Sequence, residues 1–203
     1  FFKALLFLCA GSIINSMHHQ QDIRLLGGLR KKLPIAFWSM VIGTLAITGV
    51  GIPLSYDLFH FPLGLSGFVS KDAILEGMFA ANTYPSTVSF WFLLFSAFLT
   101  SLYSWRLIIL TFLGTPRGNL EDYNSAKEES KTINITLACL SLGSIFAGVL
   151  FFNVFLGNSS EEFFSKALFI HSSNHILHDL HYIPHWAKMS PFLAMLLGFL
   201  VSF

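Results

Sequence analysis

Three ionisable residues stand close together in a stretch that is otherwise apolar. Lys71 and Asp72 are adjacent in the run GFVSKDAILEG, and Glu76 follows four residues after Asp72. On insertion scales, a lysine or an aspartate at the centre of a membrane helix costs roughly 2.5–3.5 kcal/mol. Residues of this kind inside a membrane usually mark ion pathways or proton relays. The stretch therefore predicts a site of proton transfer.

Helical spacing indicates how these side chains are arranged. Neighbours at i and i+1 do not face each other on a helix, so Asp72 is not a ready partner for Lys71, whose partner is expected on another helix. Asp72 and Glu76 share a face, and two carboxylates that are close in dry surroundings tend to hold one proton between them. The structural alternative is that Lys71 extends along its own stem to the membrane surface.

Two further cations fall inside apolar runs. Lys3 has only apolar residues at its helical neighbour positions, so it either finds a partner elsewhere in the bundle or flanks the membrane surface. Arg106 lies near the far end of a long apolar run and is expected to anchor that helix at the interface, with a supporting role at the proton site as the alternative.

The composition indicates the elements that hold these residues. Of the 203 residues, 54% are hydrophobic and 11% are charged, whereas soluble domains carry about a quarter charged residues. A bilayer partner is therefore predicted. The net charge of +1 lacks the basic footprint that nucleic-acid partners require. Cys9 and Cys139 lie in apolar runs and are expected to be small buried residues without a disulfide.

Runs of about 20 apolar residues predict an all-α fold, a polytopic transmembrane helix bundle with about six spans. The expected spans are residues 1–17, 33–52, 58–81, 87–113, 132–156 and 190–203. The two end spans are short, which indicates a piece of a longer protein or one part of a protein that is encoded in pieces. The third span carries Pro62 and Gly64 ahead of Lys71, a combination that predicts a broken helix.

The segments between these spans are polar. Residues 1–113 are interpreted as the bundle proper, 114–131 as a polar loop, 132–156 as a further membrane helix, 157–189 as a histidine-rich connection, and 190–203 as the start of another span. The basic loop 18–32 is expected on the cytoplasmic or matrix side, following the positive-inside tendency.

A run of histidines at helical spacing marks the connection 157–189. Its members follow one another at intervals of four, three, three and four residues: His171, His175, His178, His181 and His185. A spacing of i and i+4 can bind a metal. The stretch lies between spans, however, so a surface helix on the bilayer is the preferred interpretation. No phosphate loop, cysteine cluster or nucleophile with a base is found, so neither a metal, a cofactor nor a catalytic residue is expected in this chain.

Four stretches carry a family resemblance. FFKALLFLCAGSII, QDIRLLGGLRKKLP, GFVSKDAILEG and TSLYSWRLIILTFLG follow in this order within residues 1–116. Together they resemble the C-terminal half of the chain 5 family of NADH:ubiquinone oxidoreductase, the antiporter-like, proton-pumping subunits of respiratory complex I. The later stretch HYIPHWAKMSPFLAMLLGF is similar to the alphaproteobacterial and mitochondrial members.

The resemblance implies a role in proton translocation, driven by electron transfer from NADH to ubiquinone in other subunits. Lys3 matches the lysine of the family's His-Ala-Phe-Phe-Lys motif, and Lys71 and Asp72 match the broken-helix lysine and its acidic neighbour. Asn15 and Gln20 replace a histidine and a glutamate of many mitochondrial relatives, which removes ionisable groups from the end of the first span.

The resemblance also implies partners and a location. NADH, FMN, iron–sulfur clusters and ubiquinone are then bound by other subunits. The expected partners are other complex I membrane subunits, including the neighbouring antiporter-like subunit, and a separate N-terminal half if the protein is naturally split. The expected location is the mitochondrial inner membrane, with the bacterial plasma membrane as the alternative. Two other functions stay open: a subunit of a multi-subunit cation/proton antiporter, and a structural assembly segment without transport.

Overall fold

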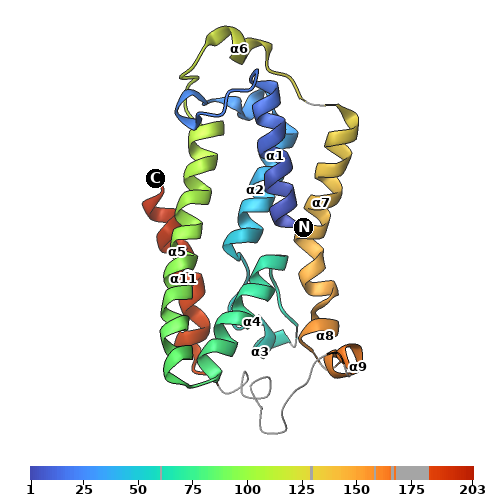
Figure 1. Cartoon of the computed structure of the whole chain (residues 1–203), viewed down its shortest axis with the longest axis vertical. Coiled ribbons are helices and arrows are strands. Elements are labelled where there is room, and N and C mark those ends of the chain that lie inside the picture. Colours follow the sequence, from blue (N-terminus) through green and yellow to red (C-terminus); the bar gives the residue numbers. More distant parts are fainter. Residues whose placement is uncertain (60, 129, 158, 166, 168–182) are drawn as a thin grey trace.

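The computed structural model describes residues 1–59, 61–128, 130–157, 159–165, 167 and 183–203. Within these ranges the chain is built of helices, and its one β-type pairing is an isolated bridge. The α-helices are α1 Phe2–Ser16, α2 Pro34–Thr48, α3 Ser55–Phe59, α4 Ser66–Ala80, α5 Tyr84–Phe112, α6 Leu120–Ser125, α7 Lys131–Leu150, α8 Phe152–Phe155, α9 Ser160–Phe164 and α11 His185–Val201. Figure 1 shows the longer ones as an elongated bundle, which confirms the predicted all-α architecture.

The outer surface of the bundle is strongly apolar. Phe92 and Leu150 are each 71% exposed, and Leu200 is 66% exposed. Soluble monomers rarely expose large contiguous apolar surfaces, whereas lipid tails require them. Helices α5 and α7 are long and apolar enough to cross a bilayer, and α1, α2 and α11 are shorter apolar helices. The exterior fits a protein surrounded by lipid.

Helices α2 and α4 lie one after the other along α5. Phe37, near the start of α2, contacts Phe112 at the end of α5, with ring centroids 5.2 Å apart. Phe79, near the end of α4, contacts Phe90 near the start of α5 at 5.4 Å. Two helices of 15 residues measure roughly 22 Å each, and the 29 residues of α5 measure roughly 43 Å. The combined length of α2 and α4 therefore matches the length of α5, which corresponds to a single crossing of the membrane.

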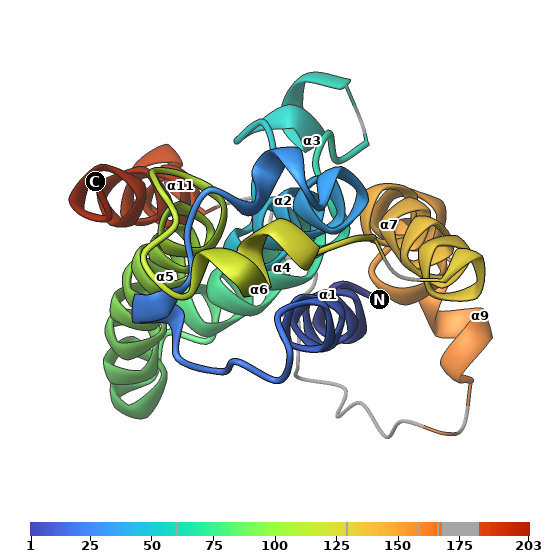
Figure 2. The ribbon, with the colours of Figure 1, turned by 90° about the horizontal axis from the view of Figure 1, so that it is seen from above.

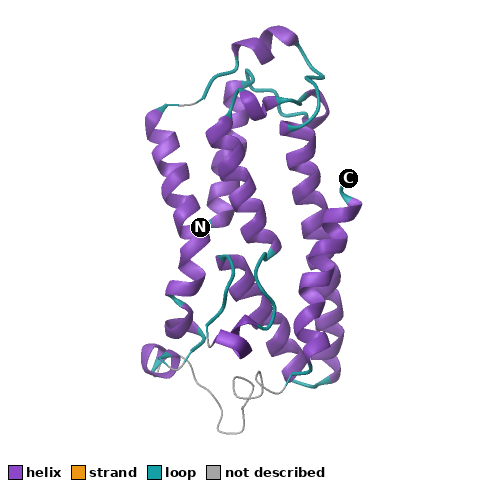
Figure 3. Ribbon diagram, turned by 180° about the vertical axis from the view of Figure 1, so that it is seen from behind, coloured by secondary structure: helices purple, strands orange, loops and turns teal. Residues whose placement is uncertain are grey.

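This arrangement corrects the prediction for residues 33–81. The second and third spans were expected to be separate crossings, but they are two halves of one discontinuous crossing (Figure 1). The expected helix from residue 58 begins only at Ser66, and an extended loop precedes it. Figure 3 shows that loop, in teal, about midway along the bundle, and Figure 2 shows it with α3 at the bundle's outer edge. The sequence pattern missed this because each half is apolar enough to resemble a whole span.

Two charged connections lie together at one end of the bundle (Figure 2). They are residues 17–33, between α1 and α2, and residues 113–130, between α5 and α7, and together they are called the polar cap. The amide of Gly28, a left-handed residue with φ +68°, donates to the carbonyl of Leu113 at 3.2 Å. The Nε of Arg117 donates to the carbonyl of Leu26 at 2.8 Å, and the Tyr123 hydroxyl donates to that of Gly28 at 3.2 Å. The predicted polar loop 114–131 is thus folded, and contains helix α6.

Helix α11 begins before the span predicted from residue 190. It starts at His185, directly after Pro184, and packs along α5, where the Ser101 hydroxyl donates to the carbonyl of Met195 at 2.7 Å. His185 is exposed, whereas the other four histidines of the predicted surface helix lie outside the described residues. The expectation for Cys139 was wrong, because this side chain is exposed on α7, while Cys9 is buried as expected.

Candidate functional site

The break between α2 and α4 is a loop whose backbone groups are partly hydrogen-bonded to one another. Gly49 ends α2 in the left-handed region, with φ +80°, and its amide donates to the carbonyl of Ala46. The chain then runs extended, and the amide of Ile52 donates to the carbonyl of Leu63 at 2.7 Å. The Ser55 hydroxyl accepts a bond from the Leu63 amide. Such pairing makes irregular backbone tolerable at membrane depth, where unsatisfied polar groups are costly.

Close backbone contact joins the first turn of α4 to the end of α2. A Cβ added to Gly67 would lie 1.7 Å from the carbonyl oxygen of Ala46. No side chain fits there, so a glycine is required. Because Lys71 lies one helical turn after Gly67, it shares the face of α4 that is turned toward α2. Accordingly, a Cβ added to Gly49 would lie 3.5 Å from the Cδ of Lys71.

The ammonium nitrogen of Lys71 is enclosed. Its Nζ is buried and has no hydrogen-bond partner among the described residues. The stem lies against the C-terminal end of α2, where a helix carries partial negative charge. In general, burial opposes the charged form of an amine and nearby negative charge favours it, so modest rearrangements can bind or release the proton. This is the chemistry that the enclosed lysine makes available.

The two predicted acids lie on the same helix as Lys71. Asp72 and Glu76 are both half-buried residues of α4, separated by one turn. The structure thus places one amine and two carboxyl groups within six consecutive residues of a half-helix. The expectation that the partner of Lys71 lies on another helix stays a prediction.

The two remaining predicted cations are exposed in the described part of the chain. Lys3 lies in the first turn of α1, which packs mainly against α2 and α7. Arg106 lies within the last two turns of α5. The structure describes neither of them as packed against Lys71, so their roles also stay predictions.

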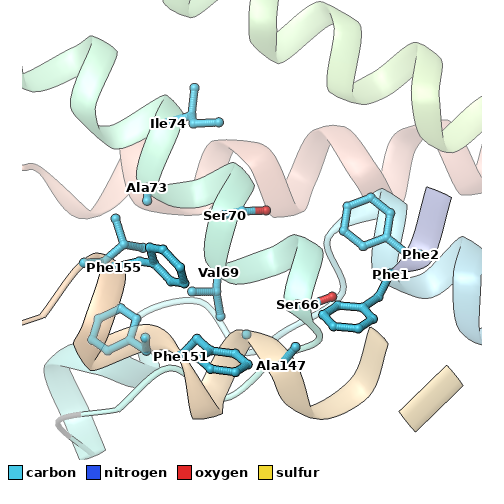
Figure 4. Close-up of a pocket in the computed structure, with 13 residues that line it drawn as sticks. Phe1, Phe2, Ser66, Val69, Ser70, Ala73, Ile74, Ala147, Phe151 and Phe155 are labelled. Carbon is cyan, nitrogen blue, oxygen red and sulfur yellow. The ribbon is translucent and has the colours of Figure 1, made fainter. Parts of the chain in front are cut away.

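A cavity of about 530 Å³ opens on another face of α4, between α1, α7 and α8. Ser66 and Ser70 contribute its hydroxyl groups, and the remaining walls are apolar, including Phe1, Phe151 and Phe155 (Figure 4). The Ser66 oxygen is buried without a hydrogen-bond partner in the described structure. With so few polar groups on its walls, the cavity is unsuited to conducting a proton.

Lys188 is a buried cation that the sequence pattern did not indicate. This residue lies in the first turn of α11 and is 8% exposed. It was assigned to the connection 157–189, because the last span was expected to begin only at residue 190. The available signal was the apolar pattern that continues on both sides of it, in HWAKMSPF.

A helical membrane bundle with a discontinuous crossing is an arrangement that recurs among ion-translocating membrane proteins. The sequence profile described as "NADH:quinone oxidoreductase/Mrp antiporter, TM" matches residues 1–102, and "NADH dehydrogenase subunit 5 C-terminus" matches residues 103–166. The chain belongs to the NADH:quinone oxidoreductase/Mrp antiporter membrane-subunit family.

Individual relatives agree with this assignment. NADH-quinone oxidoreductase subunit L of Rhodobacter capsulatus is 38% identical over 98% of this chain and 35% of its own length. NADH-ubiquinone oxidoreductase chain 5 of Chondrus crispus is 41% identical over 100% of this chain and 29% of its own length. NADH-ubiquinone oxidoreductase chain 5 of Rhizopus stolonifer is 37% identical over 97% of this chain and 28% of its own length. The chain thus spans about a third of the length of the curated relatives it matches.

Proposed function

We propose that this chain is part of a membrane subunit of NADH:quinone oxidoreductase that translocates protons, driven by electron transfer in other subunits. Lys71 is the central proton carrier, and Asp72 and Glu76 exchange protons with it. The observation that supports this role is the buried Nζ of Lys71, which lies at the break of a discontinuous crossing and has no hydrogen-bond partner in the described structure. Discontinuous helices are a recurring way to build ion and proton sites in membranes.

A multi-subunit cation/proton antiporter is the second candidate, because the family of residues 1–102 includes Mrp antiporters. It would use the same bundle and lysine but no redox partner. The profile for the C-terminus of NADH dehydrogenase subunit 5, over residues 103–166, favours the redox complex. A purely structural role is the third candidate, in which Lys71 contributes only to packing.

The proposal extends to partners, cofactors and location. NADH, FMN, iron–sulfur clusters and ubiquinone bind to other subunits, and this chain binds no cofactor of its own. Its partners are other membrane subunits of the complex, including a neighbouring antiporter-like subunit. The chain 5 relatives support the mitochondrial inner membrane, and the Rhodobacter capsulatus relative supports a bacterial plasma membrane as the alternative.

The test is proton pumping by the intact complex in proteoliposomes, with Lys71→Met and Lys71→Arg variants of this chain. Methionine removes the amine. Arginine keeps a positive charge but does not release its proton. We expect both variants to pump fewer protons per NADH oxidised than the unchanged complex, at equal amounts of assembled complex.

The matched control is Lys127→Met, because Lys127 is an exposed lysine of the polar cap. This variant should pump normally. Full pumping by both Lys71 variants contradicts the proposal. Proton movement that follows an imposed sodium or potassium gradient, without NADH and quinone, favours the antiporter instead.

A further inference from the structure

Lys188 is a buried ionisable group that the site around Lys71 does not include. Among the residues that the structure describes, Lys188 is the only charged one that is buried as a whole residue, at 8% exposure. Lysines are almost never fully buried without a specific reason, and inside a membrane that reason is usually functional. The residues packed around Lys188 therefore indicate its role.

One side of the first turn of α11 packs against apolar side chains. Ala187 shares a buried cluster with Leu75 of α4 and Phe90 of α5. The ring of Trp186 meets the ring of Phe79 of α4 at 5.3 Å. Lys188 follows these two residues in the helix and is itself only 8% exposed, so it does not lie at an open surface. This packing argues against a lysine that merely extends to the membrane surface.

The helix around Lys188 continues through Pro191 but lacks one of its backbone hydrogen bonds. Pro191 has no amide hydrogen to donate to the carbonyl of Ala187, and the Ser190 hydroxyl donates to that carbonyl instead, at 2.8 Å. Lys71 likewise lies next to a break in regular helical bonding, since α4 begins only at Ser66. Both lysines thus lie within two helical turns of a place where backbone hydrogen bonding is incomplete.

Among the described residues, the two helices that pack most closely against α11 differ in charge: α5 carries no charged residue between Tyr84 and Arg106, whereas α4 carries Lys71, Asp72 and Glu76. Leu75, which packs with Ala187, lies between the two acids and one helical turn, roughly 6 Å, beyond Lys71. On α11 itself, His185 is exposed at the helix start. The acids of α4 are therefore level with the start of α11.

We propose that Lys188 is a further proton carrier of this chain, one step beyond Lys71 and its two acids; the inference rests on the proposed function. The ammonium of Lys71 gives its proton to the carboxylate of Asp72 or Glu76. That carboxyl group passes the proton to the amine of Lys188, which later releases it toward the end of the bundle where α4 meets α5. Only N–H and O–H bonds form and break, and no electron moves.

The test uses Lys188→Arg and Lys188→Met in the intact complex, beside Lys71→Arg. Arginine keeps the positive charge, so an ion-pairing role would survive the change, whereas a role that needs proton release would not. We expect both Lys188 variants to lose as large a share of pumping per NADH as Lys71→Arg does. NADH:quinone electron transfer, measured with an uncoupler, should remain normal per assembled complex.

The control pair is Lys131→Arg and Lys131→Met, since Lys131 is an exposed lysine at the start of α7. Both should pump normally. Full pumping by Lys188→Arg overturns the inference, because a fixed charge is then sufficient, and so does full pumping by Lys188→Met. Failure of both Lys188 variants to assemble also overturns it, by assigning the residue to packing.

These outcomes are separable from failure of the proposed function. If Lys71→Arg pumps fully, the proposed function fails and this inference fails with it. If Lys71→Arg loses pumping while a Lys188 variant keeps it, only the inference fails.

Discussion

Gly67 of α4 and Ala46 of α2 are in backbone contact, since a Cβ on Gly67 would lie 1.7 Å from the Ala46 carbonyl oxygen. This contact holds the two halves of the discontinuous crossing together. It also fixes the face of α4 that carries Lys71 against Gly49, the residue that ends α2. The position of the lysine thus depends on a neighbouring residue that has no side chain.

Gly67→Ala should therefore destabilise the crossing. The added methyl group cannot be accommodated unless α4 moves away from α2, and we expect a loss of about 3 kcal/mol, the upper end of usual overpacking costs. The measurement is the amount of assembled complex and its midpoint of thermal inactivation. Gly77→Ala is the control on the same helix, because a Cβ there meets nothing within 4 Å and alanine favours helix. Equal behaviour of the two variants would refute the contact.

The start of α2 is hydrogen-bonded to a carboxylate from the connection between α5 and α7. The Oε1 of Glu128 accepts a hydrogen bond from the amide of Ile35 at 2.6 Å, in the first turn of α2. Glu128→Ala should cost about 1 kcal/mol, as does the loss of other helix N-terminal caps. Thermal inactivation of the complex measures the loss. The exposed neighbour Lys127 supplies the control, Lys127→Ala, which should change the midpoint little.

The packing of α11 on α5 depends in part on one buried hydroxyl. The Ser101 side chain is 0% exposed and donates to the carbonyl of Met195 at 2.7 Å. Ser101→Ala should lower stability by about 1 kcal/mol, the usual net value of one such bond. Ser96→Ala, at an exposed position of the same helix, is the matched comparison. A Ser101→Ala protein as stable as the Ser96→Ala protein would show that the bond contributes nothing.

The turn that follows α1 should respond to acid. Hydrogen bonds from the Arg24 side chain and amide lower the pKa of Asp22 to about 2, from 3.8, and the carboxylate in turn raises the pKa of Arg24. The folded pKa is depressed, so the bonds stabilise this turn fully above about pH 4. The stabilisation is lost as the pH falls toward 2.

Carbon-13 NMR of aspartate-labelled full chain in detergent checks this, with the Asp22 signal assigned by an Asp22→Asn sample. The carboxyl group should titrate near pH 2, and Arg24→Gln should return its midpoint to near the ordinary value of 3.8. A midpoint that is the same with and without Arg24 would contradict the expected bonds.

Much of the architecture follows from local pattern. The apolar run of residues 87–113 predicted α5 closely, because a long uncharged stretch bounded by turn residues has one stable solution in lipid. Pro62 and Gly64 likewise indicated an interruption ahead of Lys71. The sequence reading failed where local pattern is ambiguous: residues 33–52 and 58–81 each resemble a whole span, and each supplies half of one.

By itself, the sequence determined that this chain is a membrane helix bundle and that Lys71, Asp72 and Glu76 lie within an apolar stretch, because composition and apolar run length decide the solvent that a chain requires. Only the tertiary structure decided that α2 and α4 share one crossing, that the Nζ of Lys71 is enclosed at their junction, and that Lys188 is buried. The physical reason is that burial arises from contacts between residues far apart in the chain. Gly67 against Ala46 and Ala187 against Leu75 are two such contacts.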